Sequence, residues 1–287
     1  TLASTPSPSP NTPANVLSIA GTDPTGGAGI QADLKTFGAL GAYGMAVVTA
    51  VVAQNTQAVR VVSPLAPELV QAQLEAVFED VTVAAVKIGM VANAEIAEAI
   101  AEVLARHRPP FVVFDPVMAA STHKRLMNES DLERIHTVLL PQVSLLTPNL
   151  KEAARLLDIA QPVDEAGMRA CLPALQALGV PNVLLKGGHL ADDTPDAPES
   201  TDLLATPEGV IRLSAPRIAT RHGHGTGCTL SSAIAALWPR HGLEKATRMA
   251  KDYVHGALLH ADALRVGHGR GPLHHFWQAV HLPGQLA

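Results

Sequence analysis

The chain has 287 residues, of which 47% are hydrophobic and 16% charged, and its formal net charge is −5. That length accommodates one large α/β domain or two small ones. Aromatic residues make up only 3% of the chain and no basic stripe is visible, so we expect no nucleic-acid partner. Because the only cysteines are Cys171 and Cys228, we expect no disulfide framework and a cytoplasmic location.

No segment has the pattern of a signal peptide or a membrane span, so we expect no membrane partner. The apolar run 45–53 is too short to cross a bilayer and is rich in β-branched residues. The Ser/Pro-rich opening, residues 1–14, is typical of a flexible tail. We therefore place the folded domain at 15–287, with no linker that divides it and no fused partner enzyme after it.

In the first half of the chain, apolar runs alternate with helical patterns. The strands are predicted at 16–20, 45–53, 83–88 and 111–114. The helices between them are predicted at 30–40, 68–80 and 94–106.

The alternation continues in the second half. Helices are predicted at 132–140, 150–158, 165–178, 229–237 and 244–264, and strands at 143–146 and 183–185. A β-hairpin is predicted from 201–205 and 210–213, and residues 191–200 are predicted to form a surface loop. Strand–helix alternation of this kind predicts an α/β fold with a mostly parallel central sheet and helices on both faces.

Polar residues repeatedly follow the predicted strands, at the edge where parallel sheets bind ligands. The residues at these ends are Gly21, Thr22, Asp23, Gln54, Asn55, Gly89, Met90, Asp115, Thr147, Asn149 and Lys186. Each alone could be a turn or a cap, but turns alone are a poor explanation for so many. The pattern therefore predicts a ligand site at this edge.

The segment His222–Thr229 places three glycines and a cysteine directly before an apolar helical run. A glycine turn that leads into a helix directs free backbone N–H groups toward one point, where the helix dipole adds positive charge. Such a turn binds anions, most often phosphate, and favours a thiolate at Cys228. The alternative is a glycine-rich turn with a buried thiol, and the segment alone favours neither.

Asn149 and Glu152 are three residues apart at a helix start, where they face the same side. Together they could hold a hydrated Mg²⁺ beside phosphates. Out of context, a capping box explains the same spacing better.

Three further residues have both a binding and a structural interpretation. Lys186 ends a strand before two glycines, so it either reaches a phosphate or extends to water. Asp33, in the first turn of the first helix, either accepts from a donor-bearing heterocycle or simply complements the helix dipole. Gln54 either pairs with a pyrimidine edge or faces solvent. The histidines lack the spacing of metal ligands, so we expect no zinc site.

Taken in order, these segments resemble the hydroxymethylpyrimidine/phosphomethylpyrimidine kinases of thiamine biosynthesis, members of the ribokinase superfamily. The segments that carry the resemblance are Ala20–Thr36, Val52–Thr56, Lys87–Met90, Asp115–Met118, Thr147–Asn149, Lys186–His189 and His224–Thr229. The match extends over essentially the whole predicted domain, and the ordered set is more specific than any one motif.

The resemblance implies a ribokinase-like kinase domain over 15–287 that uses ATP as co-substrate and Mg²⁺ as cofactor, and that forms a homodimer. The implied reaction phosphorylates 4-amino-5-hydroxymethyl-2-methylpyrimidine to its monophosphate, and then the monophosphate to the diphosphate at the same site. A flap is expected to close over this site, because water must be kept from the γ-phosphate.

The resemblance also implies roles for individual residues. The pyrimidine pocket is expected to be lined by Gly21, Asp33, Val52, Gln54 and Met90. The nucleotide and metal are expected at Asp115, Asn149 and Glu152, with Asp115 and Glu152 holding Mg²⁺ through water. Lys186 is expected to contact the transferred phosphoryl group. The anion hole is expected at Gly225, Thr226 and Gly227.

Cys228 stands where relatives such as ribokinase and pyridoxal kinase carry an aspartate base. We expect its thiolate to deprotonate the hydroxymethyl group in the first step. The second acceptor is already an ionised phosphate and needs no base.

Two alternatives remain beside this interpretation. A pyridoxal kinase of the same superfamily is the nearer one, since some members phosphorylate both substrates. A non-catalytic pyrimidine sensor ranks lower, because the residues expected to bind phosphate are all present.

Overall fold

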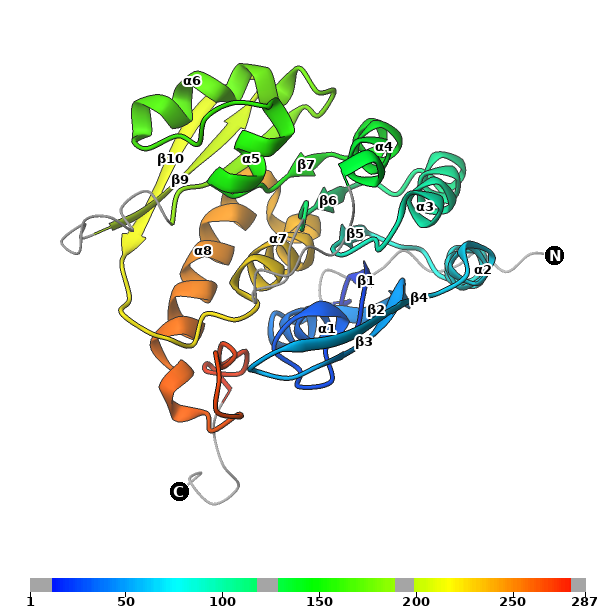
Figure 1. The fold of residues 1–287 in the computed structure, drawn as a ribbon, viewed down its shortest axis with the longest axis horizontal. Coiled ribbons are helices and arrows are strands. Elements are labelled where there is room, and N and C mark those ends of the chain that lie inside the picture. The colour runs from blue at the N-terminus through cyan, green and yellow to red at the C-terminus, as the bar shows by residue number, and fades with distance from the viewer. Residues whose placement is uncertain (1–11, 118–128, 189–198, 280–287) are drawn as a thin grey trace.

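The computed structural model describes residues 12–117, 129–188 and 199–279. Its centre is an eight-stranded sheet with the order β10-β9-β8-β7-β6-β5-β1-β2 (Figure 1). These strands are β1 (Asn15–Ala20), β2 (Tyr43–Val48), β5 (Ala85–Ile88), β6 (Val112–Phe114), β7 (Leu145–Leu146), β8 (Asn182–Lys186), β9 (Glu199–Thr206) and β10 (Gly209–Pro216). From β2 to β8 neighbouring strands are parallel, and β9 is antiparallel to both β8 and β10. The predicted α/β fold with a mostly parallel sheet is confirmed.

Helices cover both faces of the sheet (Figure 1). One layer contains α2 (Pro67–Phe78), α3 (Ala94–His107), α4 (Glu129–Leu139), α5 (Leu150–Leu157) and α6 (Glu165–Gln176). The other layer contains α1 (Gly29–Ala39), α7 (Thr226–His241) and α8 (Leu243–Leu259). Short 3-10 turns at Leu140–Gln142 and Ala261–Ala263 complete the helical segments.

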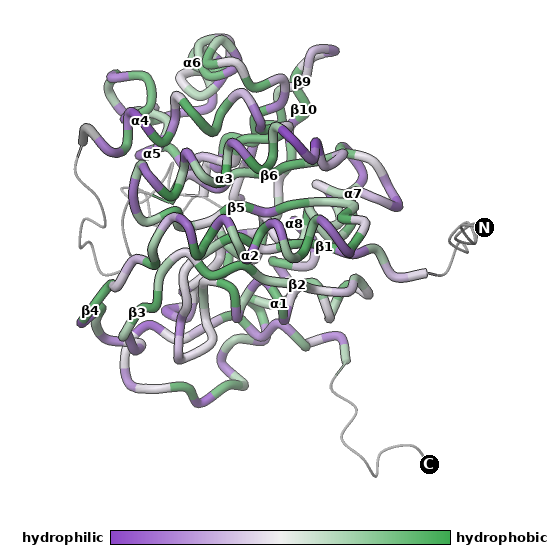
Figure 2. Tube along the Cα trace, turned by 90° about the vertical axis from the view of Figure 1, so that its right-hand side faces the viewer, coloured by the Kyte–Doolittle hydropathy of each residue, from purple (hydrophilic) through white to green (hydrophobic). Residues whose placement is uncertain are grey.

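Two hydrophobic cores lie on opposite sides of the sheet, because successive strand residues point to opposite faces. In β1, Val16 belongs to the core under α1, α7 and α8, whereas Leu17 belongs to the core under α2 to α6. Ala85 and Val86 of β5 divide in the same way. Figure 2 shows the apolar colour concentrated in the strands and on one side of the helices. Burial on both faces explains why the strand sequences are almost continuously apolar.

The predicted single strand over 45–53 is wrong. The chain leaves the main sheet after Val48 and enters a separate antiparallel pair made of β3 (Ala50–Gln54) and β4 (Val59–Pro64). In β3, Ala50 and Val52 are buried while Val51 is exposed. The two strands follow each other with only Thr49 between them, so they look like one apolar run in the sequence.

The predicted hairpin is present as β9 and β10, which pair from Glu199 to Pro216. Most of the tail predicted over 1–14, and most of the loop predicted over 191–200, lie outside the described residues, so both stay predictions. In the part of the chain that is described, no helix is long and apolar enough to span a membrane.

Candidate active site

A cavity of about 590 Å³ lies at the carboxyl ends of the parallel strands and is lined by residues from both halves of the chain. The structure brings together twelve of the thirteen residues that the sequence assigned to the site. Those that line the cavity are Gly21, Val52, Gln54, Met90, Asp115, Asn149, Glu152, Lys186, Gly225, Thr226, Gly227 and Cys228. The exception is Asp33, which does not line it.

Lys186 and Asp115 form an ion pair at the ends of β8 and β6. The Lys186 Nζ donates to Asp115 Oδ1 at 2.9 Å, and the Thr147 hydroxyl, 3.3 Å away, donates to the same oxygen. Burial lowers the pKa of Lys186, but the carboxylates of Asp115 and Glu152 outweigh burial and raise it overall. The side chain therefore stays a cation beside the cavity, available to an anionic ligand.

Asn149 and Glu152 form the capping box that their spacing predicts, and both also line the cavity. The Asn149 Oδ1 accepts from the Glu152 N–H at 2.9 Å, and Glu152 Oε2 accepts from the Asn149 N–H at 2.8 Å. Burial raises the pKa of Glu152; Lys186 opposes the rise and Asp115 adds to it. The structural and binding interpretations are therefore compatible, because the cap fixes two oxygen-bearing side chains at the cavity wall.

The N-terminus of α7 forms the third wall of the cavity. Gly225 precedes the helix with φ of +83°, a conformation that favours glycine. Within the described chain, the N–H groups of Gly225, Gly227 and Cys228 have no backbone partner. A Cβ on Gly227 would lie 3.2 Å from both Lys186 Nζ and Asp115 Oδ2. The helix end, with its free donors and dipole, therefore adjoins the Lys186–Asp115 pair.

Cys228 lies in the first turn of α7 and lines the cavity. The expectation that this position favours a thiolate is not met. Burial raises the pKa of Cys228, Lys87 lowers it, and Asp33 and Asp115 raise it further. A hydrogen bond from the Gly29 N–H to the thiol also lowers it. Burial destabilises the thiolate more than Lys87 and the Gly29 N–H stabilise it, so Cys228 is a thiol at neutral pH.

The opposite end of the cavity is formed by β1, β3 and the segment after β5. Gly21 leaves room for Met90, since a Cβ on Gly21 would overlap the Met90 methyl group and lie 3.6 Å from Val52. The Val52 N–H donates to the Thr22 hydroxyl at 2.9 Å. Gln54 lines the cavity, and its side chain also bonds to Asp23. This end combines apolar walls with a side-chain amide, as a flat polar heterocycle requires.

Asp33 lies in α1 beneath the cavity, with no exposed surface. Its oxygens accept from Lys87 Nζ at 2.8 and 2.9 Å, from Ser18 Oγ at 2.6 Å and from Ser232 Oγ at 2.6 Å. The helix begins at Gly29, so Asp33 also lies beyond its first turn. The sequence does not show Lys87 and the serines as partners, because they come from three other elements.

Asp23 and His224, to which the sequence assigns no individual role, join the two ends of the site. The Asp23 carboxylate accepts from the N–H groups of Thr25, Gly27 and Ala28, and lies 3.0 Å from His224 Nε2. Burial raises the pKa of Asp23, but these hydrogen bonds outweigh burial and hold it well below its usual range. Asp23 therefore ties the glycine loop after β1 to the glycine loop before α7.

Two further cavity residues, Asp202 and Lys251, were also missed. Lys251 Nζ donates to Asp202 Oδ2 at 2.6 Å, and the Gly187 N–H donates to Asp202 Oδ1 at 3.0 Å. Arg217 lines the cavity as well and donates to the Gly188 carbonyl at 2.7 Å. These residues lie on β9, on α8 and directly after β10, where no sequence motif marks them. Among the described residues, no group of three or more histidine, cysteine or acidic side chains could hold a metal ion.

A lysine, two carboxylates and a helix N-terminus around one cavity, at the carboxyl edge of a doubly covered sheet, define a small-molecule kinase. Comparison with known proteins shows which family of small-molecule kinases this is. A family model described as phosphomethylpyrimidine kinase matches residues 23–274, and the chain belongs to this family.

Individual relatives agree with this assignment. The chain is 54% identical over 263 residues to the hydroxymethylpyrimidine/phosphomethylpyrimidine kinase of Salmonella typhimurium, a match that covers 91% of this chain and 97% of the relative. Its structure is similar to phosphomethylpyrimidine kinase from Clostridium difficile 630, with TM-score 0.74, 38% identity, and coverage of 85% and 99%. It is also similar to an ADP complex of Bacillus subtilis pyridoxal kinase, with TM-score 0.84, 29% identity, and coverage of 94% and 100%.

Proposed function

We propose that the chain transfers the γ-phosphoryl group of ATP to 4-amino-5-hydroxymethyl-2-methylpyrimidine, and then to the resulting monophosphate, for thiamine biosynthesis. The observation that carries the proposal is one cavity with two ends. One end has Gly21, Val52, Gln54 and Met90, which suit a pyrimidine, and the other has the phosphate-binding features around Lys186.

Phosphoryl transfer needs alignment and charge neutralisation more than covalent chemistry. In the proposed arrangement, Lys186 binds the transferred phosphoryl group and the free N–H groups at the start of α7 bind its oxygens. Gly225 and Gly227 let the backbone approach, since a Cβ on Gly225 would overlap the Gly27 carbonyl and one on Gly227 would crowd Lys186 and Asp115. The groups that neutralise charge are thus fixed before the substrates bind, and little reorganisation is needed during transfer.

Mg²⁺ fits the donor set at the Asp115 end of the cavity. Magnesium is usually held by one or two carboxylates together with substrate phosphates and water. Asp115 and Glu152 line the same cavity, and Asp115 contributes to the raised pKa of Glu152, which a nearby cation would reverse. We propose that these two residues hold the ion through water. When bound, it would neutralise the negative charge of the triphosphate.

We propose that Cys228 accepts the proton of the hydroxymethyl group in the first step. It lines the cavity at the start of α7, where it adjoins the anion hole. The raised pKa makes the thiolate a minor species, so the first step is expected to accelerate as pH rises. The second acceptor is an ionised phosphate, which does not require this base.

A second candidate, pyridoxal phosphorylation, is favoured by one observation: the higher TM-score to the Bacillus subtilis pyridoxal kinase. Purified protein is therefore incubated with Mg·ATP and either hydroxymethylpyrimidine or pyridoxal, and the products are separated over time. Monophosphate followed by diphosphate supports the proposal. Monophosphate alone, or a strong preference for pyridoxal, assigns the second function. Tight pyrimidine binding without turnover contradicts both and indicates a sensor.

We also propose that the chain forms a homodimer through the exposed face of the β3–β4 sheet. Val51 and Val61 lie on the same face of this sheet and are 53% and 57% exposed, whereas Val52, on the opposite face, lines the cavity. Exposed apolar side chains that gather on one sheet are typical of an association surface. Analytical ultracentrifugation tests the proposal: a Val51→Glu, Val61→Glu variant is expected to sediment as a monomer. A monomeric unsubstituted protein would contradict it.

A further inference from the structure

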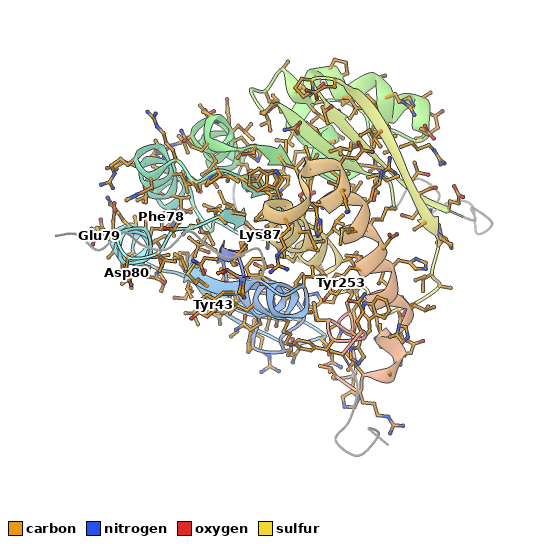
Figure 3. The ribbon with its side chains drawn as sticks, turned by 180° about the vertical axis from the view of Figure 1, so that it is seen from behind. Tyr43, Phe78, Glu79, Asp80, Lys87 and Tyr253 are labelled. Carbon is orange, nitrogen blue, oxygen red and sulfur yellow. The ribbon has the colours of Figure 1, made fainter. Side chains whose placement is uncertain are left out.

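The buried pair formed by Asp33 and Lys87 connects four elements of the fold. Asp33 lies on α1 and Lys87 on β5, and neither side chain has exposed surface. Ser18 of β1 donates to one Asp33 oxygen and Ser232 of α7 to the other, both at 2.6 Å. The charges are thus compensated and hydrogen-bonded, the condition under which an ion pair is tolerated in a protein interior. Lys87 is labelled in Figure 3, near the centre of the molecule.

The network lies one helical turn below the reactive end of the cavity. On α7, Ser232 follows Cys228 by four residues, and on α1, Asp33 follows Gly29 by four residues. Residues four apart lie on the same helix face. The Gly29 N–H contacts the Cys228 sulfur, and the Ser232 hydroxyl bonds to Asp33 one turn lower. The two helices are therefore joined by two successive contacts, of which only the upper one faces the cavity.

We propose that Asp33, Lys87 and Ser232 are positioning residues that hold the first turn of α7 against α1, and so hold Cys228 and the anion hole at the acceptor. The proposal rests on the function proposed above for Cys228. Removal of the Ser232 contact leaves α7 in place as a core helix, but frees its first turn to shift. Shifts of this size matter because phosphoryl transfer depends on alignment.

The network also sets the charge around the thiol. The charged groups that face Cys228 are Lys87 from β5, Asp33 from α1, Asp115 after β6 and Lys186 at the end of β8. Lys87 itself lines the cavity, whereas Asp33 is behind it. The pair therefore presents its positive member to the thiol, and the arrangement favours the thiolate when Cys228 gives up its proton.

Ser232→Ala and Ser18→Ala form a matched pair for the test. Each removes one buried hydroxyl with a 2.6 Å bond to Asp33, but only Ser232 lies on α7. The measurements are kcat and KM with hydroxymethylpyrimidine, thermal unfolding, and the pH dependence of Cys228 alkylation by iodoacetamide, followed by peptide mass spectrometry. Ser232→Ala is expected to lower kcat about tenfold with KM for ATP little changed, since it disturbs alignment and not nucleotide binding. Its alkylation profile is expected to move to higher pH.

Ser18→Ala is expected to lose a similar amount of thermal stability with a much smaller loss of kcat. Equal losses of kcat from the two variants, or an unmoved alkylation profile in Ser232→Ala, would overturn the positioning role. An Asp33→Asn, Lys87→Met double variant removes both charges together, so that no unpaired ion is buried, and keeps one acceptor oxygen for a serine hydroxyl. This variant is expected to move the alkylation profile to higher pH. An unchanged profile would contradict the claim that the Lys87–Asp33 pair favours the Cys228 thiolate. If Cys228→Ala keeps full activity, Cys228 is not the base of the first step. The alkylation profiles of Ser232→Ala and Ser18→Ala would still test whether Ser232 positions Cys228.

Discussion

Among the described residues, three lysine–aspartate pairs lie near this edge of the sheet, and two of them, Lys87–Asp33 and Lys186–Asp115, differ in what surrounds them. In the Lys87–Asp33 pair, both oxygens of the carboxylate accept from Lys87, and each accepts from one serine as well. In the Lys186–Asp115 pair, the lysine and Thr147 both donate to Oδ1, and Oδ2 has no hydrogen-bond partner within the described chain. The Asp33 carboxylate is fully bonded and does not line the cavity, although Lys87 does, whereas Asp115 lines the cavity with Oδ2 still able to accept a hydrogen bond.

The difference shows how an ion pair's surroundings indicate its role. A closed, fully bonded pair mainly stabilises and orders the elements it joins, because it has nothing left to offer a ligand. An open pair keeps its charges in place and exchanges cavity water for substrate oxygens when ligand binds. The same residue types thus form a fully bonded buried pair at one strand end, and at another the pair to which we assign a catalytic role.

Replacement of Lys186 is expected to separate the two roles most clearly. Lys186→Ala should lower kcat by about 10²- to 10³-fold, the usual cost of losing one preorganised charge-stabilising group. Because Asp115 borders the cavity, urea denaturation should show a smaller loss in the free energy of unfolding than Lys87→Met shows. Lys151→Ala, an exposed position on α5, is the control and should keep full activity. A large loss of stability in Lys186→Ala would indicate that this pair is architectural too.

Replacement of Lys87 should give the opposite balance of effects. Lys87→Met leaves the Asp33 charge buried without its ion partner, so the free energy of unfolding should fall by about 3–5 kcal/mol. Adding Asp33→Asn should restore part of this loss, because no unpaired charge then remains. Urea denaturation of the single and double variants measures both values. If the single variant is as stable as the unsubstituted protein, the Lys87–Asp33 pair is not the closed structural unit described above.

A smaller loss of kcat is expected from a substitution at Gly227, where α7 adjoins the Lys186–Asp115 pair. In Gly227→Ala, the new Cβ would lie 3.2 Å from both Lys186 Nζ and Asp115 Oδ2 and would force one of them to move. We expect kcat to fall about tenfold, in keeping with the sensitivity of catalysis to small misplacements. Gly38→Ala is the matched control, since Gly38 is also helical and nothing lies within 4 Å of its added Cβ. Equal kcat values in Gly227→Ala and Gly38→Ala would contradict the expected effect of crowding the Lys186–Asp115 pair.

The sequence predicts the fold well because continuous apolar runs mark strands buried on both faces. It fails at 45–53, where two strands of different sheets join without a polar break. It also misses β4, whose three valines are interrupted by Arg60 and are only partly buried or exposed. The residues assigned from motifs meet in one cavity because parallel strands end at one edge. Asp33 departs from its expected place because burial and its partners, Lys87, Ser18 and Ser232, depend on tertiary packing. Lys251 and Asp202 were missed for the same reason.

The central claim is that one site serves two acceptors and that Cys228 acts as base only for the first. The most direct test measures the two half-reactions separately in Cys228→Ala, with hydroxymethylpyrimidine and with its monophosphate, as a function of pH. Burial raises the pKa of Cys228 and the base works when deprotonated, so the rate of the first step should rise with pH into the alkaline range. In the variant, this rise should disappear and the first step should slow about a hundredfold, a typical cost of losing a general base. The second step should keep most of its rate, and loss of the second step alone, or equal loss of both, would contradict the account.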